Sequence, residues 1–233
     1  MCIFFDLIWG IAAGIVSVTM NGEQEPVGKA FDSSYCNNRM QPFIQLLPGF
    51  SGLPPELFKE AVKHTGIYFH RAGTLLRSAG DTSDRIYFIR KGLVHIYRGE
   101  GKKKKTEWLA SEGEYICPFN RFMLQQPSGV YYETLEKTEV HVITFPVFMQ
   151  LYRHPLFRKA ADALAMERLY HINDFLLKNC GSAGNRYANF LEFFPNLDNR
   201  VPLQFIASLL DVCPKTISRI RAQSYKMSKS LTA

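Results

Sequence analysis

Residues 203–222, LQFIASLLDVCPKTISRIRA, carry the pattern that decides the fold of the C-terminal part of the chain. Apolar residues fall on one face of each of two short predicted helices: Ile206, Ala207 and Leu210 on the first, Ile217 and Ile220 on the second. Val212 lies in the turn between them, and small Ala207 stands where the two helix axes should cross. This spacing is typical of a helix-turn-helix, whose second helix enters the major groove of DNA.

The outward face of the second predicted helix is rich in hydrogen-bond donors. Lys215, Thr216, Ser218 and Arg219 would point away from the apolar face, and such side chains suit base edges and phosphates. We therefore predict that these four residues contact double-stranded DNA.

The positive charge of the chain is concentrated at the same end. The 233 residues carry a net charge of +7, and residues 200–233 hold six basic residues and one acidic residue, a net charge of +5. A basic end of this kind favours a polyanionic partner over a merely solvated tail, given the helical pattern beneath it.

The cysteines and histidines indicate neither a disulfide framework nor a metal site. Five cysteines are widely spaced without a CxxC pair, and six histidines are scattered without ligand spacing. This usage fits a reducing cytoplasm, and we predict no metal and no cofactor. Four placed cysteine ligands for an iron–sulfur cluster are missing, and no residue stands out as a haem ligand.

The first 41 residues form an apolar and then irregular extension. Residues 3–20 are almost wholly apolar but contain Asp6, and no Lys or Arg precedes them as in a signal peptide. We expect the fold to begin near Met40 and residues 1–39 to be an extension that is not translated. The alternative is a membrane anchor, which we do not favour.

The middle of the chain changes to the period of a β-strand after a short helical entry at 42–64. The expected strands are Tyr68–Arg71, Thr74–Arg77, Arg85–Arg90, Leu93–Arg98, Thr106–Ala110 and Tyr131–Phe145. Short strands separated by glycine turns predict a small β-barrel or jelly roll, so the fold class is α+β.

A long helix is expected from Pro155 through Lys178. Ala165, Leu169, Ile172 and Leu176 recur at spacings of four, three and four, which favours a seam that pairs two copies of the helix. The segment Cys180–Gly184 should end this helix and form a hinge, before another helix at Asn185–Phe194.

A small barrel, a long helix and a terminal helix-turn-helix resemble the Crp/Fnr superfamily of transcription regulators. The resemblance covers residues 42–223 and rests on three segments: FHRAGTLLRSAGDTSDRIYFIRKGLVHIYR at 69–98, GEYI at 113–116, and IASLLDVCPKTISRI at 206–220. The two helices of the helix-turn-helix are called the reader below. The chain ends soon after the second of them, which resembles a short-tailed branch of the family that has no β-hairpin wing. The resemblance implies an extension at 1–41, a cyclic-nucleotide-binding-like effector domain at 42–150, a dimer helix at 151–180 and a DNA-binding domain at 181–233.

The segment that resembles the phosphate-binding cassette departs from the pattern of cyclic-AMP-binding members. Counted without gaps from Gly113, the position of the ribose-binding glutamate is Pro118, and the Arg-Ser pair is replaced by Ser128 and Gly129. A buried phosphate needs a charge-assisted partner such as arginine. We therefore predict that cyclic AMP is not bound in the usual mode. The candidates for a pocket that takes another, unidentified effector are Gly113, Glu114, Cys117 and Arg121.

The reader also departs from the family pattern. Asp211 replaces the usual turn glycine, and aspartate tolerates the left-handed backbone better than most residues. Cys213 takes the place of a serine or threonine cap, while Pro214 suits the first helical turn. Arg219 matches the base-reading arginine of the family, but Lys215 stands where glutamate is frequent, so no base preference can be transferred.

The favoured function is that of a homodimeric transcription regulator that reads a two-fold operator. RNA polymerase is a candidate for a further partner. The alternative is an effector-binding or interaction module that has lost sequence-specific DNA binding. An enzyme of the cupin-like class would need clustered metal ligands, whereas His95 and His141 stand alone in their strands. We therefore do not expect an enzyme.

Overall fold

The computed structural model describes residues 54–56 and 65–231. The predicted extension at 1–41, with its apolar segment and Met40, lies outside the described residues. Most of the expected helical entry also lies outside them, although Pro55 and Glu56 are helical. Among the described helices, none combines the length and the apolar composition needed to cross a bilayer.

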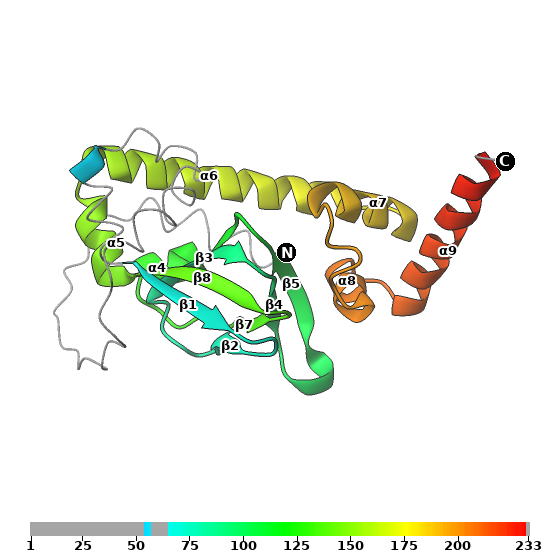
Figure 1. Ribbon diagram of the computed structural model, residues 1–233, viewed down its shortest axis with the longest axis horizontal. Helices are drawn as coiled ribbons and strands as arrows, with labels where there is room; N and C mark the ends of the chain where they lie inside the picture. The colour runs from blue at the N-terminus through cyan, green and yellow to red at the C-terminus, as the bar shows by residue number, and fades with distance from the viewer. Residues whose placement is uncertain (1–53, 57–64, 232–233) are drawn as a thin grey trace.

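In the described residues, eight strands form two antiparallel four-stranded sheets (Figure 1). One sheet has the order β1-β8-β3-β6 and the other β2-β7-β4-β5. The strands are β1 Gly66–His70, β2 Leu75–Arg77, β3 Arg85–Lys91, β4 Val94–Arg98, β5 Lys105–Ala110, β6 Tyr115–Ile116, β7 Tyr131–Thr134 and β8 Thr138–Thr144.

The predicted alternatives of barrel and jelly roll resolve in favour of the jelly roll, because the two sheets do not close into a barrel. The strand-forming segment expected at 131–145 is divided at residues 135–137. Its first half, β7, pairs with β2 and β4, whereas its second half, β8, pairs with β1 and β3. One tight turn thus carries the chain from one sheet to the other.

Strand β3 shows why these strands read as nearly continuous apolar runs. Tyr87 and Ile89 face the space between the sheets, while Ile86 and Phe88 belong to a second cluster on the outer face. Helices cover that outer face, so both faces of the strand are buried. The helices concerned are α4 Phe119–Met123, α5 Phe145–Tyr152 and the start of α6 Pro155–Lys178.

Sequence reasoning located α6 with its observed ends but missed three elements. Strand β6 has only two residues, and α4 and α5 are short helices next to strands, where periodicity carries little information. After α6 come α7 Ala183–Phe193, α8 Leu203–Leu209 and α9 Pro214–Leu231; the tip of the β4–β5 hairpin holds η1 Gly101–Lys103.

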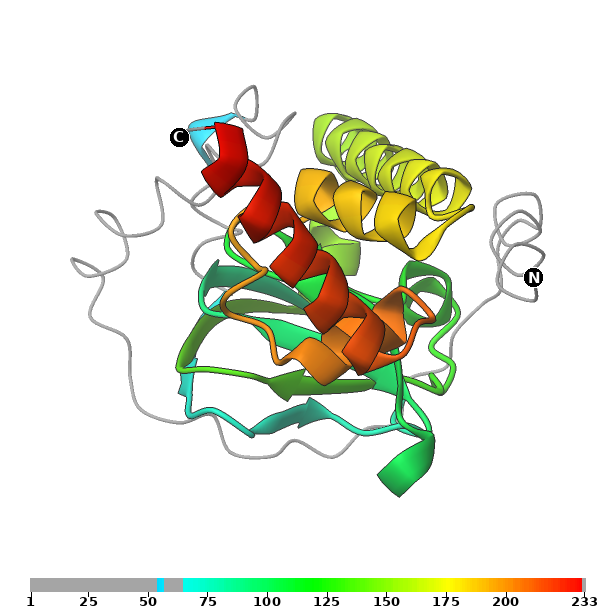
Figure 2. The same ribbon diagram turned by 90° about the vertical axis from the view of Figure 1, so that its right-hand side faces the viewer.

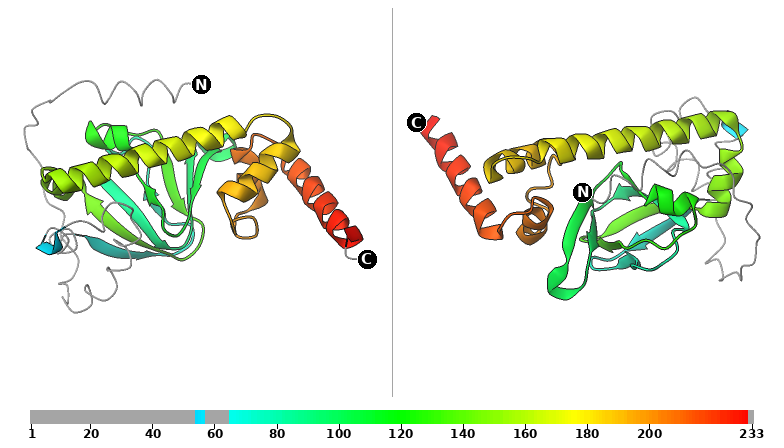
Figure 3. Two further views of the ribbon diagram at one scale, coloured as in Figure 1. Left: turned by 90° about the horizontal axis from the view of Figure 1, so that it is seen from above. Right: turned by 180° about the vertical axis from the view of Figure 1, so that it is seen from behind.

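A single hydrophobic cluster joins the sandwich to the C-terminal helices. Trp108 of β5 lies edge-on to Phe175 of α6 and Phe194 after α7, with ring centroids 5.3 and 5.0 Å away. The same cluster continues to Ile206 in α8 and Ile217 in α9. Figure 2, which faces the C-terminal end, shows α8 and α9 in front of the sheets. Figures 1 and 3 show that α8 lies next to the end of the sheets, whereas α9 extends beyond α7.

Candidate functional site

Helices α8 and α9 pack through the apolar residues that the sequence predicted. Ile206, Leu210 and Ile217 are fully buried, and Ala207 is 1% exposed. In the turn, the Val212 amide donates to the Ala207 carbonyl at 2.9 Å. Asp211 has a φ of 54°, so the left-handed conformation expected at this position is confirmed, and Pro214 is the first residue of α9 as predicted.

The four predicted DNA-contacting residues lie in the first turns of α9. Lys215, Ser218 and Arg219 are exposed, whereas Thr216 is half-buried and its amide donates to the Cys213 carbonyl at 2.8 Å. Within the described part of the chain, the side chains of Lys215 and Arg219 form no hydrogen bond or ion pair. This face of α9 therefore carries two cations with unused donors.

Two other basic residues of the C-terminal end are used within the chain. Arg221 donates to the Tyr187 hydroxyl at 2.9 Å and forms an ion pair with Asp198 at 2.5 Å. Arg200 also binds carboxylates of its own chain. The net charge of residues 200–233 is therefore larger than the charge available to bind a polyanion. A count of charges in the sequence cannot distinguish a free arginine from one that is paired within the chain.

Arg186 of α7 holds the turn between α8 and α9. Its Nη1 donates to the carbonyls of Leu210 and Asp211, at 2.7 and 3.3 Å. These carbonyls lie at the end of α8, where backbone acceptors have no partner within the helix. Arg221 of α9 contacts α7 in turn, so two arginines hold α9 and the turn before it in place relative to α7.

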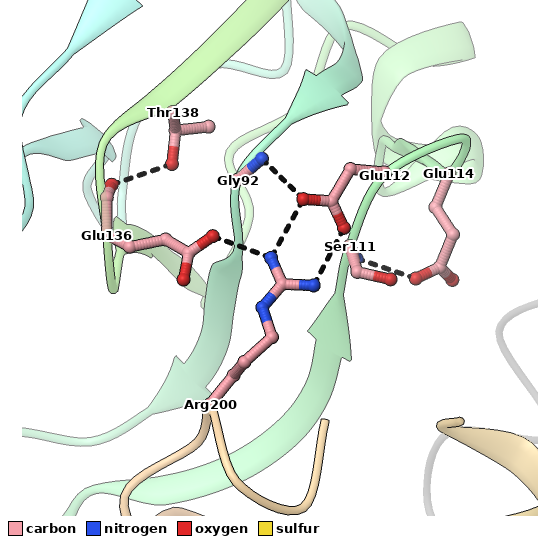
Figure 4. Close-up of polar contacts among 7 residues, drawn as sticks. All are labelled: Gly92, Ser111, Glu112, Glu114, Glu136, Thr138 and Arg200. Atoms are coloured by element: carbon pink, nitrogen blue, oxygen red, sulfur yellow. Dashed lines mark hydrogen bonds and ion pairs between the residues drawn. The ribbon is translucent and has the colours of Figure 1, made fainter. Parts of the chain in front are cut away.

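The loop before α8 is bound to the turns of the sandwich by Arg200 (Figure 4). Arg200 donates to both carboxylate oxygens of Glu112, at 2.9 and 2.8 Å, and to Glu136 at 2.6 Å. Glu112 lies in the β5–β6 turn and Glu136 in the β7–β8 turn. Planar, two-pronged contacts of this type are the strong form of ion pair.

The backbone of Gly92 completes the same cluster. Its amide donates to Glu112 Oε1 at 2.9 Å. Gly92 has a φ of 111°, and an added Cβ would lie 2.7 Å from the Thr138 Cα, so only glycine fits. Burial opposes ionisation of Glu112, but the Arg200 guanidinium and the Gly92 amide hold the pKa of its carboxyl at about 2.

A second glutamate in the same turn binds the long helix. Glu114, a predicted effector-pocket residue, accepts from Arg168 of α6 at 2.7 Å and from the Ser111 amide at 2.8 Å. The Arg168 guanidinium also lies 4.7 Å from the centroid of the Trp108 ring. The turn Ser111–Glu114 is therefore bound to α6 through Glu114 and to the loop before α8 through Glu112.

Helix α8 rests directly on β5. The Thr106 amide donates to Ser208 Oγ at 2.9 Å, and the ring of Phe205 stacks on His95 with centroids 4.1 Å apart. His95 Nε2 lies 2.9 Å from Thr106 Oγ1, and the residue is 1% exposed. Burial lowers the pKa of His95 to about 4, so the imidazole is neutral at pH 7.

The remaining effector-pocket candidates have separate partners. Gly113 occupies the β5–β6 turn with a φ of 84°, and Arg121 in α4 donates to Gln126 at 2.7 Å. Cys117 lines a small apolar cavity between β3, α5 and α6, and burial raises the pKa of its thiol. Within the described residues, no group of three or more His, Cys, Asp or Glu side chains could hold a metal ion.

The functional side chains that sequence reasoning missed are Glu112, Arg168 and Arg200. Arg200 and Glu112 are 88 residues apart, and Arg168 and Glu114 are 54 apart. Because such pairs follow no local spacing, only the fold could identify them.

Comparison with known proteins agrees with this architecture. The family model described as the cyclic nucleotide-binding domain matches residues 69–154. No curated protein matches the sequence of the chain.

Three solved structures share the fold at low sequence identity. The global regulator CLP of Xanthomonas campestris, reported as c-di-GMP responsive, has a TM-score of 0.59 at 16% identity, and the match covers 75% of this chain and 93% of CLP. FixK2 of Bradyrhizobium japonicum has a TM-score of 0.60 at 16% identity, covering 70% and 86%. A candidate cyclic nucleotide binding protein of Ruegeria pomeroyi has a TM-score of 0.58 at 19% identity, covering 79% and 87%.

Residues 69–154 thus match the cyclic nucleotide-binding domain, and the described fold is shared with CLP and FixK2.

Proposed function

We propose that this protein is a homodimeric, DNA-binding transcription regulator of the Crp/Fnr type. The observation that carries the proposal is the exposed face of α9, where Lys215 and Arg219 have no partner in the described part of the chain. Ile217 and Arg221 anchor the opposite side of the same helix. An anchored helix that presents free donors suits insertion into a major groove.

The proposed dimer uses the outward face of α6. In the predicted seam, Leu169 is half-buried and Leu176 is 44% exposed. The exposed side chains of Met166, Tyr170 and Leu177 extend the apolar surface beside them. Ile172 packs on the core of its own chain and Ala165 lines the apolar cavity, so we place both at the edge of the seam. A paired α6 would set the two readers about one DNA turn apart, as a two-fold operator requires.

The dimer is tested by sedimentation equilibrium of the full chain. Leu177 is 67% exposed, so Leu177→Glu should leave the fold intact while it introduces a charge into the seam. We expect the wild type to be a dimer and Leu177→Glu to be a monomer. Leu75→Glu on β2, an exposed leucine on the other side of the sandwich, should remain dimeric. A wild-type monomer at tens of micromolar would contradict the seam.

The proposed effector domain, residues 42–150, does not bind cyclic AMP in the usual mode. Pro118, at the expected glutamate position, is the N-cap residue of α4, and Ser128 is buried with its backbone bonded to Gly80 and Asp81. Glu114 is bound to Arg168. Isothermal titration with cyclic AMP tests this, and micromolar binding would overturn it.

An effector would act by shifting an equilibrium between reader orientations. The turn Ser111–Glu114 is suited to this role, because it binds both α6 and the loop before α8. The dimer helix at 151–180 and the DNA-binding domain at 181–233 complete the proposed division, with RNA polymerase as a further proposed partner.

DNA reading is tested by selecting bound sequences from random DNA, followed by mobility shifts on the selected site. We expect a two-fold sequence, and Arg219→Ala should weaken specific binding by about 1–3 kcal/mol, the usual loss for a bidentate base contact. Arg153→Ala removes an equal charge outside the reader and should bind normally. Lys226 and Lys229 should chiefly affect the salt dependence. Failure to select any sequence would favour the alternative, a module that has lost DNA reading.

A further inference from the structure

Arg77 is the one buried arginine in the described part of the chain. It ends β2, is 5% exposed, and its Cζ lies 5.8 Å from the centroid of the Tyr132 ring inside the sandwich. Moving a guanidinium out of water is unfavourable unless an opposite charge compensates it.

The hydrogen bonds of Arg77 go only to neutral groups. Its Nη2 donates to the Asp81 carbonyl and to Ser83 Oγ, both at 2.6 Å. The Nε atom is buried. The Nε and Nη1 groups of the guanidinium have no hydrogen-bond acceptor in the described residues.

Most of the partly buried arginines in the described residues differ from Arg77, although Arg186 also donates only to carbonyls and has a buried Nε without an acceptor. Four arginines with side chains 18–33% exposed each form an ion pair with a carboxylate: Arg90 with Glu139, Arg168 with Glu114, Arg200 with Glu112 and Arg221 with Asp198. Arg77 is more deeply buried than any of them and forms no ion pair with a described residue.

The acidic protons near Arg77 do not supply the missing negative charge. Tyr87, Tyr132 and Cys117 lie close enough for its charge to act on them, but burial raises the pKa of all three groups and outweighs that effect. At neutral pH they remain uncharged, so no described group forms an ion pair with Arg77.

A surface loop lies against the Arg77 head group. Gly80, Asp81 and Thr82 are exposed, and the loop that they form supplies the carbonyl that holds Nη2. Its backbone is bonded to Ser128, through Gly80 N to Ser128 O at 2.8 Å and Ser128 N to Asp81 O at 3.2 Å. An anion could reach Arg77 by opening this loop without unfolding of the sheets.

We propose that Arg77 anchors an oxyanion-binding site inside the sandwich, which takes the phosphate or carboxylate group of a small molecule. This proposal rests on the effector domain proposed above and names the chemical class of its ligand. It needs no arginine in the segment 122–143, because β2 supplies the cation from the other side of the loop. The bound anion would pair with the one buried guanidinium that has no carboxylate of its own.

The test is thermal unfolding of the full-length protein with inorganic phosphate, or separately acetate, replacing chloride at constant ionic strength. We expect saturable stabilisation by at least one of the two anions, and their comparison shows whether the site prefers phosphate or carboxylate. Arg77→Met, which removes the charge at similar volume, should raise the half-saturating concentration at least tenfold. Arg90→Met and Arg219→Ala should leave it unchanged, which separates this site from a paired arginine and from the DNA face.

Three outcomes would overturn the site: no saturable stabilisation of the wild type, the same effect in Arg77→Met, or its loss in Arg219→Ala. If Arg77→Met does not fold, Arg77→Lys is measured instead, and it should bind the anion more weakly but saturably; an unchanged half-saturating concentration would contradict the geometry. Mobility shifts on the same preparations separate this proposal from DNA reading, because a protein that binds DNA but no oxyanion disproves only the Arg77 site.

Discussion

Arg200 binds both carboxylate oxygens of Glu112, and this pair joins the loop before α8 to a turn of the sandwich (Figure 4). The two side chains are about one-third exposed, so the contribution of the pair to stability is modest. Its position matters more, because the loop that it holds leads directly into the reader. We therefore expect the orientation of α8 to depend on the charge of Glu112.

Replacement of Glu112 by glutamine tests this dependence. Glu112→Gln removes the charge and leaves Arg200 with Glu136 alone, so we expect the free energy of unfolding to fall by about 1 kcal/mol. Hydrogen exchange of the α8 amides should become faster. Glu107→Gln breaks the Arg98–Glu107 pair within the β4–β5 hairpin and should leave α8 exchange unchanged. Equal exchange in wild type and Glu112→Gln would contradict the role of the pair.

The stability of the protein should fall as the pH drops from 6.5 toward 4. His95 is buried with a pKa lowered to about 4, whereas its unfolded value is 6.5, so the unfolded chain binds the proton first. The stability lost through His95 should reach about 2 kcal/mol at pH 5. Urea unfolding of wild type and His95→Gln at pH 7 and 5 measures it. The variant should lose less stability than the wild type over this interval, although His141, also lowered to about 4, contributes separately. Equal losses would mean that His95 titrates normally.

Glu112 should add a second, more acidic transition. Its pKa is about 2 in the folded protein and 4.5 without its partners, so its contribution is present above pH 4.5 and is lost as the pH falls toward 2. We expect the difference in hydrogen exchange of the α8 amides between wild type and Glu112→Gln to disappear only below about pH 2, where the Glu112 carboxyl is protonated. A difference between the two proteins that vanishes already at pH 5 would contradict the low pKa.

The left-handed backbone at Asp211 predicts an asymmetric response to substitution. Asp211→Val should lower the free energy of unfolding by about 1–2 kcal/mol, because a β-branched residue is strained at a φ of 54°. Asp211→Gly should cost nothing or stabilise slightly, since glycine adopts this conformation freely. Both variants remove the weak contact with Lys105, so that contact cancels in the comparison. Chemical denaturation of the two variants decides, and equal stabilities would contradict strain at this turn.

Two arginines of α9 should behave differently. Arg221→Ala leaves Asp198 without its ion pair and should lower the free energy of unfolding by about 1–3 kcal/mol. Arg219→Ala removes an exposed side chain without a partner in the described chain and should change it by less than about 0.5 kcal/mol. Urea titration of both variants separates an anchoring arginine from a free one. A stability loss in Arg219→Ala as large as in Arg221→Ala would show that Arg219 is used within the fold.

Local patterns were sufficient for the long α6, the two helices of the reader and the larger strands. In these elements each side chain reports its own environment through spacing, as Ile206, Ala207 and Ile217 do. The strain at Asp211 was also predictable, because the turn needs a residue that tolerates positive φ. Strand β6 and helices α4 and α5 were missed because they are too short to show a period.

By itself, the sequence determined the order of the larger elements, the position of the two-helix reader and the lack of an arginine at residues 122–143. Each of these is written in neighbouring residues. Only the tertiary structure decided which charges are free: it pairs Arg200 and Arg221 within the chain, exposes Arg219, and buries Arg77 without a carboxylate. The physical reason is that an ion pair depends on distance in space, whereas a sequence pattern reports only distance along the chain.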